Sequence, residues 1–128
     1  MAIRCLIVDD SPRFAQAATE LLEEEGIDVL GLATGGEEAV RLARDLRPDL
    51  TLVDIDLGEE NGLTIAGRLC AEAPGGLAGA VILISTHAKE EFAELIAASP
   101  AVGFLAKSDL GADAIGALLS RPDQELVE

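Results

Sequence analysis

Five polar residues in this chain stand where a short apolar run ends, and their side chains could do chemistry together. Three are acids, one carries a hydroxyl and one is a lysine. The apolar runs and the residues that follow them are 3–8 with Asp9 and Asp10, 50–53 with Asp54, 80–84 with Ser85, and 101–106 with Lys107. Carboxylates bind divalent metal ions, while an ammonium group and a hydroxyl can bind phosphoryl oxygens. The set predicts a site for a metal ion and a phosphoryl group, provided that the fold brings these residues together.

The three acids would place like charges close together at neighbouring strand ends. Such carboxylates resist being ionised at the same time. A hard cation removes the conflict, and Mg²⁺ is typically held by one or two carboxylates together with waters. The segment Asp9-Asp10-Ser11 also has a simpler explanation, because Asp and Ser residues commonly form turns and helix caps. Both explanations stay open for this segment alone, and the remaining polar residues favour the metal site.

Asp54 could act as a metal ligand or as a nucleophile. A carboxylate that attacks phosphorus forms an acyl phosphate. That reaction needs a metal ion and a nearby cation to stabilise the charge on the transferred oxygens. Lys107 could supply the cation, and Ser85 could donate a hydrogen bond to a phosphoryl oxygen. The alternatives are a surface lysine before a turn and a strand-end cap.

The apolar pattern alternates between strands and helices five times. Ser11-Pro12 is a helix-start signal, and Thr34 with Glu37 matches a capping box. Near-continuous apolar runs predict buried strands at 3–8, 27–33, 50–53, 80–84 and 101–106. Helical spacing predicts helices at about 12–25, 35–46, 63–72 (after a polar loop at 58–62) and 89–98, and a last one that carries Ile115, Leu118 and Leu119.

Buried strands that alternate with amphipathic helices predict a parallel sheet covered by helices on both faces. Right-handed crossovers then place every strand-to-helix loop at one edge of the sheet. Ligands of such sheets bind at the carboxyl ends of the strands, in the crevice where the strand order reverses. All five polar residues belong to that edge, so we expect them to meet there.

Length and charge limit the possible functions further. The 128 residues predict a single domain over 1–120 and a polar tail or linker start over 121–128. The net charge of −15, from 9 basic and 24 acidic residues, disfavours binding to nucleic acid or to anionic membranes. Neither a transmembrane run nor a signal-peptide pattern is present, which predicts a cytoplasmic protein. Cys5 and Cys70 lie in apolar patterns and are expected to be buried, reduced thiols.

Four strings carry a resemblance to a known family. They are "LIVDDSP" with the paired acids, "LVDIDLGEENG" with Asp54, "ILISTHA" with Ser85, and "GFLAKSDL" with Lys107. Each string alone is a weak signal, but their order and spacing together are specific. Over about residues 3–119 the chain resembles a bacterial response-regulator receiver domain of two-component signalling.

The resemblance implies a flavodoxin-like α/β fold, with a doubly wound five-stranded parallel sheet of order 2-1-3-4-5. It makes Asp54 the residue that a sensor histidine kinase or a phosphotransfer protein phosphorylates. It also implies an Mg²⁺ ion bound directly by Asp10 and Asp54, by Asp9 mainly through water, and by the main-chain carbonyl of Asp56. The function would be signalling rather than enzymatic turnover.

The resemblance further implies that Ser85, Thr86 and Lys107 bind the phosphoryl group. Lys107 would pair first with the acceptor carboxylate and then with that group. Ser85 would move inward and Phe104 would rotate with it, altering the face formed by the fourth helix, fifth strand and fifth helix at about 89–119. Such a change is a population shift between conformations. The face would contact an output domain or a protein partner, or a second copy in a homodimer.

Three positions depart from the family's pattern. Ser108 stands where a proline commonly follows the lysine, which affects the geometry of that loop. Phe104 stands where Tyr is frequent, so its contact with a partner would be apolar. Thr86 is larger than the residue usual at its position, and with Asp56 it should influence the access of water to Asp54 and the lifetime of the phosphoryl group.

Two other functions fit parts of the sequence. Asp54-Ile55-Asp56 resembles the nucleophile loop of metal-dependent phosphohydrolases of the haloacid-dehalogenase type, although that family places its loop after the first strand. The other is a receiver-like interaction domain that does not accept phosphate. As a receiver, the chain would be either a stand-alone protein or the N-terminal module of a longer regulator, such as a DNA-binding one.

Overall fold

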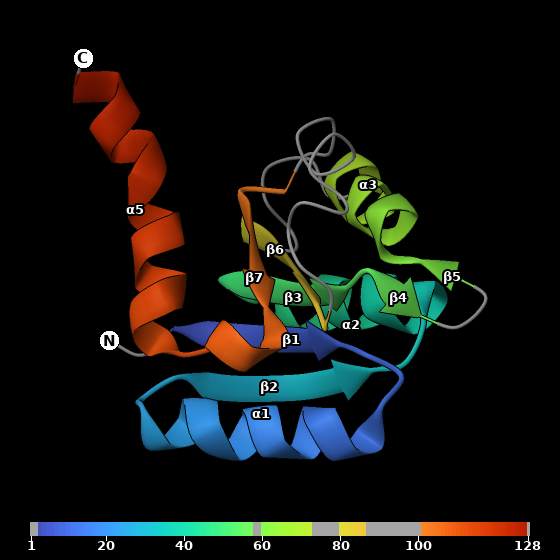
Figure 1. The fold of residues 1–128 in the computed structure, drawn as a ribbon. Helices are drawn as coiled ribbons and strands as arrows, with labels where there is room; N and C mark the ends of the chain where they lie inside the picture. Colours follow the sequence, from blue (N-terminus) through green and yellow to red (C-terminus); the bar gives the residue numbers. More distant parts are fainter. Residues whose placement is uncertain (1–2, 58–59, 73–79, 87–100, 128) are drawn as a thin grey trace.

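The computed structural model describes residues 3–57, 60–72, 80–86 and 101–127. Figure 1 shows strands and helices alternating along these residues. The fourth helix expected at 89–98 lies outside them. The elements are β1 (Arg4–Val8), α1 (Pro12–Glu24), β2 (Asp28–Ala33), α2 (Gly36–Leu46), β3 (Leu50–Asp54), β4 (Asp56–Leu57), β5 (Glu60–Asn61), α3 (Gly62–Glu72), β6 (Ala80–Ser85), β7 (Gly103–Ala106), the 3₁₀ turn η2 (Lys107–Asp109) and α5 (Ala112–Val127).

Five of the strands form one sheet, in the order β2-β1-β3-β6-β7. Every pairing in this sheet is parallel. Counted within the sheet alone, the order is 2-1-3-4-5, and the expected doubly wound fold is confirmed. The chain winds outward from β1 in both directions, so the strand order reverses between β1 and β3. In such sheets the ligand crevice lies at the carboxyl ends of the strands at this point.

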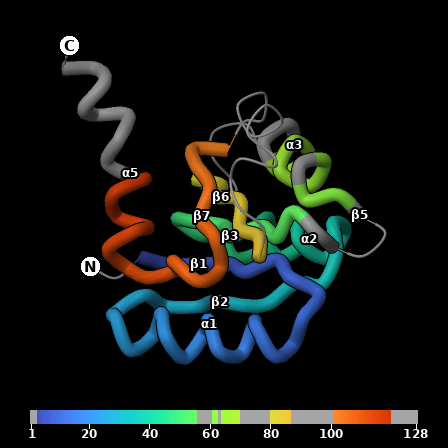
Figure 2. The backbone as a smooth tube through the Cα atoms, in the orientation of Figure 1, coloured from blue at the N-terminus to red at the C-terminus, as the bar shows by residue number. Residues whose placement is uncertain are grey.

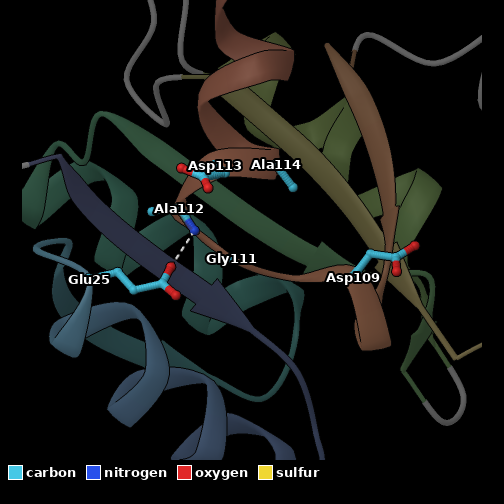
Figure 3. Close-up of a pocket in the computed structure, with 6 residues that line it drawn as sticks. All are labelled: Glu25, Asp109, Gly111, Ala112, Asp113 and Ala114. Carbon is cyan, nitrogen blue, oxygen red and sulfur yellow. Dashed lines mark hydrogen bonds between the residues drawn. The ribbon is translucent and has the colours of Figure 1, made fainter.

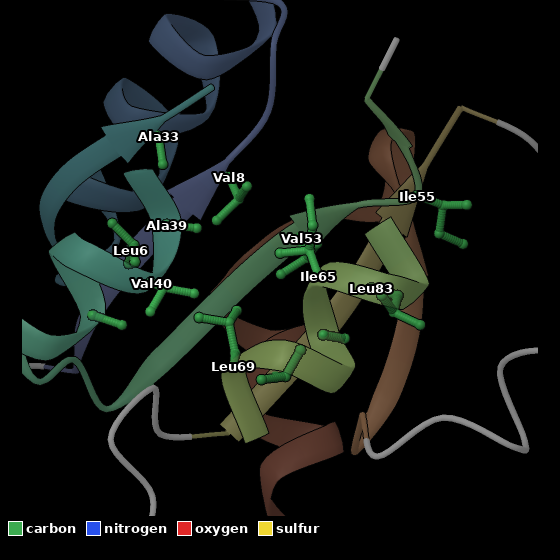
Figure 4. Close-up of a cluster of buried hydrophobic side chains, with 13 residues drawn as sticks. Leu6, Val8, Ala33, Ala39, Val40, Val53, Ile55, Ile65, Leu69 and Leu83 are labelled. Carbon is green, nitrogen blue, oxygen red and sulfur yellow. The ribbon is translucent and has the colours of Figure 1, made fainter. Parts of the chain in front are cut away.

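Side chains of the sheet point alternately into two apolar cores, because successive residues of a strand face opposite sides. In β1, Leu6 and Val8 belong to one cluster of buried residues, whereas Cys5 and Ile7 belong to the other. The first cluster is covered by α2 and α3 (Figure 4), and the second by α1 and α5. The sheet is therefore buried on both faces, as near-continuous apolar strands predict.

The register between β1 and β3 places two of the acids beside each other. Val8 pairs with Val53, so the next residues, Asp9 and Asp54, lie side by side where β1 and β3 end. The Asp9 amide donates a hydrogen bond to the carbonyl of Ala33 at 2.9 Å, which extends the ladder between β1 and β2. Figure 2 shows β1 running between β2 and β3 in the middle of the molecule.

A short hairpin lies where the sequence predicts a polar loop at 58–62: β5 falls within that range, and β4 directly precedes it. β4 and β5 pair antiparallel, with Asp56 opposite Asn61 and Leu57 opposite Glu60. Each strand has only two residues. A period-two pattern needs several residues before it can be recognised, which is why the sequence did not reveal this pairing.

The start of α2 also differs from the expected capping box. The helix begins at Gly36, with Gly35 as its N-cap. The amide and hydroxyl of Thr34 donate to Oε1 of Glu38, at 2.9 and 3.2 Å. Because the helix begins one residue later than Thr34 and Glu37 predict, the acid that reaches back is Glu38.

The last helix is longer than the apolar pattern indicates. The sequence predicts a polar tail over 121–128, whereas the backbone of α5 stays helical through Pro122 to Val127. A proline disturbs the turn that precedes it, while the residues after it can continue the helix. The division of the chain at residue 120 stays a prediction. Among the described residues, no helix combines the length and the apolarity needed to cross a membrane.

Candidate functional site

Asp9, Asp10 and Asp54 converge at the carboxyl ends of β1 and β3. One carboxylate oxygen from each lies within 4.8 Å of those of the other two. Asp9 and Asp54 are buried, at 2% and 4% exposure, whereas Asp10 is exposed. The acids therefore meet at the sheet edge, as the sequence predicts, with one of the three open to solvent.

The turn between β1 and α1 orients the carboxylate of Asp9. Its Oδ1 accepts a hydrogen bond from the amide of Ser11 at 2.8 Å. Ser11 is the N-cap of α1, and its Oγ accepts a hydrogen bond from the amide of Phe14 at 3.3 Å. The turn and the helix cap that the sequence allowed for this segment are thus present. They leave Oδ2 of Asp9 to contact Lys107.

Lys107 lies between the two buried acids. Its Nζ is 2.7 Å from Oδ2 of Asp9 and 3.3 Å from Oδ2 of Asp54, and its side chain is only 12% exposed. Burial alone would lower the pKa of the Lys107 ammonium, but the contacts with Asp9 and the charge of Asp54 outweigh it and raise the pKa above its usual 10.5. The lysine is therefore charged throughout the neutral pH range.

The acids suit a hard divalent cation. Oδ2 of Asp9 is buried, and the Lys107 ammonium pairs with it at 2.7 Å. One ammonium does not balance the charge of three carboxylates, and uncompensated charge in a buried site costs free energy. The exposed carboxylate of Asp10 leaves the cluster open to water. Mg²⁺ takes oxygen ligands and keeps several waters, so two buried carboxylates and one exposed carboxylate fit such an ion.

Phe14 is a residue of this site that the sequence did not reveal. Nζ of Lys107 lies 4.2 Å from the centroid of the Phe14 ring, in a cation–π contact. Phe14 is in the first turn of α1, half-buried, and packs against the core under α1 and α5. In the sequence it is only one apolar position of a helix. Its contact joins segments far apart in the chain, so no local pattern indicates it.

Ser85 and Thr86 lie at the carboxyl end of β6. Asp54, the last residue of β3, pairs with Ile84. Ser85 therefore lies one position further toward the carboxyl edge of the sheet. Ser85 is fully buried and Thr86 is exposed. Both hydroxyls thus belong to the edge that holds the acids, and their binding of a phosphoryl group stays a prediction.

The remaining predicted residues lie in β7, η2 and β4. Phe104 pairs with Leu83 in the sheet and packs, half-buried, against the core under α2 and α3. Ser108 is exposed in η2, directly after Lys107, and no described peptide bond is cis. Asp56 opens β4. The movement of Phe104 and the binding of a metal by the Asp56 carbonyl stay predictions.

Gly62 lies against the backbone of Asp54. Its amide donates a hydrogen bond to the carbonyl of Ile55 at 2.9 Å. A Cβ at this position would overlap the carbonyl oxygen of Asp54 and lie 2.7 Å from its carbonyl carbon. Only glycine therefore lets the start of α3 approach the end of β3 so closely. The Asn61-Gly62 pair is a turn signal in the sequence, but the neighbour that requires glycine is visible only in the fold.

Glu25 ties the end of α1 to the start of α5 (Figure 3). Its Oε1 accepts a hydrogen bond from the amide of Ala112 at 2.5 Å. Ala112 is the first residue of α5, where amides lack partners within the helix and negative charge is favourable. The segment that follows Lys107 is thus anchored at both ends. An acidic surface pocket of about 500 Å³ surrounds this cap, lined by Glu25, Asp109, Gly111, Ala112, Asp113 and Ala114.

The sheet order and the acids beside a lysine at its carboxyl edge define a class of flavodoxin-like signalling domains. Comparison with known proteins identifies the family within that class. The model of the response regulator receiver domain matches residues 5–116, and the chain belongs to this family. It is a receiver domain of two-component systems, with the phosphoacceptor fold.

Curated relatives carry the same domain in longer chains. A protein-glutamate methylesterase/protein-glutamine glutaminase of Archaeoglobus fulgidus is 37% identical, over 98% of this chain and 34% of its own length. A putative transcriptional regulator of Pseudomonas aeruginosa is 32% identical, over 83% of this chain and 50% of its own length. The chain thus spans about a third of the methylesterase relative and half of the regulator.

Solved structures agree with this assignment. The signal receiver domain of a modulated diguanylate cyclase from Desulfovibrio desulfuricans G20 has a TM-score of 0.77 and 36% identity, with all of both chains covered. The signal receiver domain of the putative response regulator NarL from Mycobacterium tuberculosis has a TM-score of 0.78 and 26% identity, covering 93% of this chain and 94% of that one.

Proposed function

We propose that this domain is a phosphoacceptor in which Asp54 takes a phosphoryl group from a phosphohistidine. The donor is a sensor histidine kinase or a phosphotransfer protein. The observation that supports this most directly is the Lys107 ammonium, 2.7 Å from Asp9 and 3.3 Å from Asp54, beside three clustered carboxylates. A carboxylate nucleophile next to a fixed cation and a metal-binding cluster is suited to phosphoryl transfer.

In the proposed reaction a carboxylate oxygen of Asp54 attacks phosphorus. The bond between phosphorus and the histidine nitrogen breaks, and its electron pair stays on that nitrogen. Because the donor ring carries a proton on its other nitrogen, it leaves as a neutral imidazole. Asp54 then carries an acyl phosphate. The Lys107 ammonium stabilises negative charge on the transferred oxygens, and it needs no change of protonation because its pKa is raised.

A bound Mg²⁺ would supply further charge stabilisation to the phosphoryl oxygens. Asp10 and Asp54 would hold the ion directly, Asp9 mainly through water, and Asp56 through its main-chain carbonyl. The buried Oδ2 of Asp9 and the exposed Asp10 support this assignment.

Phosphorylation controls the downstream output through a rearrangement of side chains at the same edge of the sheet. The hydroxyls of Ser85 and Thr86 bind the new phosphoryl group, and Phe104 rotates as Ser85 moves. The face over 89–119, which includes β7 and the start of α5, then favours a different partner: an output domain, another protein or a second copy of this chain. Methylesterase and regulator relatives, which share this domain in longer chains, support control of an output. With a net charge of −15, this domain does not itself bind nucleic acid.

Intact mass spectrometry tests the acceptor. Incubation with a small-molecule acyl phosphate and Mg²⁺ should add one phosphoryl group to the wild type and none to Asp54→Asn. Asp45→Asn, which changes an exposed acid of α2, should be modified like the wild type. A chelator should prevent the modification. Phosphorylation that persists in Asp54→Asn would show that Asp54 is not the acceptor.

Two further outcomes would support the alternative functions. Sustained release of phosphate from a generic phosphomonoester would indicate a phosphohydrolase, because a receiver domain does not turn over such a substrate. Failure to bind Mg²⁺, together with absence of phosphorylation, would indicate an interaction domain that does not accept phosphate.

A further inference from the structure

We infer that Phe14 is a positioning residue, whose ring holds the Lys107 ammonium at the acceptor carboxylate. The inference rests on the proposed function of Asp54 and adds a residue to it. Nζ of Lys107 lies 4.2 Å from the centroid of the ring while it contacts both Asp9 and Asp54. The ammonium is thus held by two carboxylates and by one aromatic face.

The contacts that place the ring begin and end at the same residue, Asp9. Oδ1 of Asp9 accepts the amide of Ser11, and Oγ of Ser11 accepts the amide of Phe14. The Phe14 ring then contacts the Lys107 ammonium, which returns to Oδ2 of Asp9. Asp9 therefore orients both the helix turn that carries the ring and the lysine that the ring contacts. Phe14 is half-buried against the core, so the ring has a packed support.

An aromatic ring affects the charge of this site differently from a further carboxylate. It attracts the ammonium without adding negative charge to a site that already has three acids. Its attraction also persists when Asp54 changes its charge during phosphorylation. The ring covers one side of the ammonium and limits the positions that the flexible lysine side chain can take. The ammonium should thus stay within reach of the incoming phosphoryl oxygens.

Two substitutions separate the ring face from its volume. Phe14→Leu keeps an apolar side chain in the core but removes the π-face, and Phe14→Tyr keeps the face. We expect Phe14→Leu to slow phosphorylation of Asp54 by a small acyl phosphate about three- to tenfold at saturating Mg²⁺, and Phe14→Tyr to restore most of the rate. Thermal unfolding should show that both variants are folded. A wild-type rate in Phe14→Leu would overturn the inference.

A double-mutant cycle with Lys107 distinguishes positioning from a general effect on the fold. In the Lys107→Ala background, Phe14→Leu should cause no further loss of rate, because the ring then has no ammonium to hold. An equal loss in both backgrounds would mean that Phe14 acts through packing alone, and would also overturn the inference.

A measurement without phosphate tests the contact itself. Lys89 and Lys107 are the two lysines of the chain, so selective labelling of lysine gives two sets of side-chain NMR signals, which Lys89→Arg assigns. The methylene protons next to the Lys107 ammonium should be shifted upfield by the ring, and Phe14→Leu should remove the shift. If wild-type Asp54 accepts no phosphate but this shift is present, the proposed function fails while the contact stands. Absence of the shift refutes the inference by itself.

Discussion

Lys107 supplies the positive charge in the described site. Asp9 and Asp54 are buried, and both carboxylates contact the same ammonium group, which is why the pKa of Lys107 is raised despite its burial. Asp9, whose Oδ2 lies 2.7 Å from the lysine, also belongs to the acid cluster that fits a divalent ion. Lysine and metal ion therefore compete for the same negative charge, in addition to acting together on a phosphoryl group.

This competition predicts that Lys107→Ala binds Mg²⁺ more tightly, although it accepts phosphate more slowly. Removing the ammonium removes its repulsion of the dication, and we expect about a tenfold gain in affinity, or ~1.4 kcal/mol, by isothermal titration calorimetry. Arg41→Ala, which removes one charge from an exposed position of α2, is the matched control and should change the affinity little. Weaker binding of Mg²⁺ to Lys107→Ala would mean that the lysine organises the acids rather than competing for them.

The acceptor is held in place by the segments that meet at the end of β3. The hairpin of β4 and β5 returns the chain so that Gly62, at the start of α3, contacts the backbone of Asp54. On the other face, Glu25 at the end of α1 caps the first turn of α5, shortly after Lys107. The end of β3, which carries the acceptor, and the segment that begins at Lys107 are thus each fixed by a contact with a different helix.

Gly62→Ala should therefore be destabilising and should displace Asp54. The added Cβ overlaps backbone atoms, which cannot rotate away as the end of a side chain can. We expect a loss of about 2–4 kcal/mol in the free energy of unfolding by chemical denaturation, and slower phosphorylation.

Gly67→Ala is the control for this prediction. Gly67 lies within α3, and a Cβ there would meet no heavy atom within 4 Å. Alanine should stabilise the helix by about 0.5–1 kcal/mol, because it restricts the unfolded chain. Equal stability of the two alanine variants would show that the close approach of Gly62 to Asp54 is not required.

The whole molecule combines an acidic surface with an aliphatic core on both faces of one sheet. The net charge is −15, and the two core clusters lie on opposite sides of the sheet strands. Cys5 lies in the core under α1 and α5, with no exposed surface. Burial raises the pKa of the Cys5 thiol from 9.0 to about 12. The expected buried, reduced thiol is confirmed for Cys5, while the side chain of Cys70 lies outside the described residues.

Because burial raises the pKa of the Cys5 thiol, we expect the folded protein to lose stability at alkaline pH. Between pH 9.0 and about 12 the unfolded chain releases the Cys5 proton while the folded protein retains it, so the free energy of unfolding must fall as the pH rises. In a Cys70→Ser background, this group should contribute a slope of about −1.4 kcal/mol per pH unit in that range. Cys5→Ala should lack this contribution. Parallel stability curves for the two proteins would contradict the burial of the thiol.

Local patterns were sufficient for much of the fold and for most of the predicted site. Apolar runs and helical spacing predict the five sheet strands, and the alternation of strands with helices predicts that their carboxyl ends share an edge. Asp9, Asp10, Asp54 and Lys107 meet there because each lies at the end of a strand or just beyond it, which is a property of the sequence itself. The family pattern agrees with these residues in order and spacing.

Contacts between distant segments were decided by the tertiary structure. The ring of Phe14 over Lys107 and the cap of Glu25 on Ala112 each join parts of the chain that no short period connects. The approach of Gly62 to Asp54 spans fewer residues, but it depends on the hairpin that turns the chain between them. The sequence determined which residues reach the edge of the sheet, because strand periodicity is local. Packing of the helices against that sheet determined how the lysine and the acceptor are held, because it depends on all the elements at once.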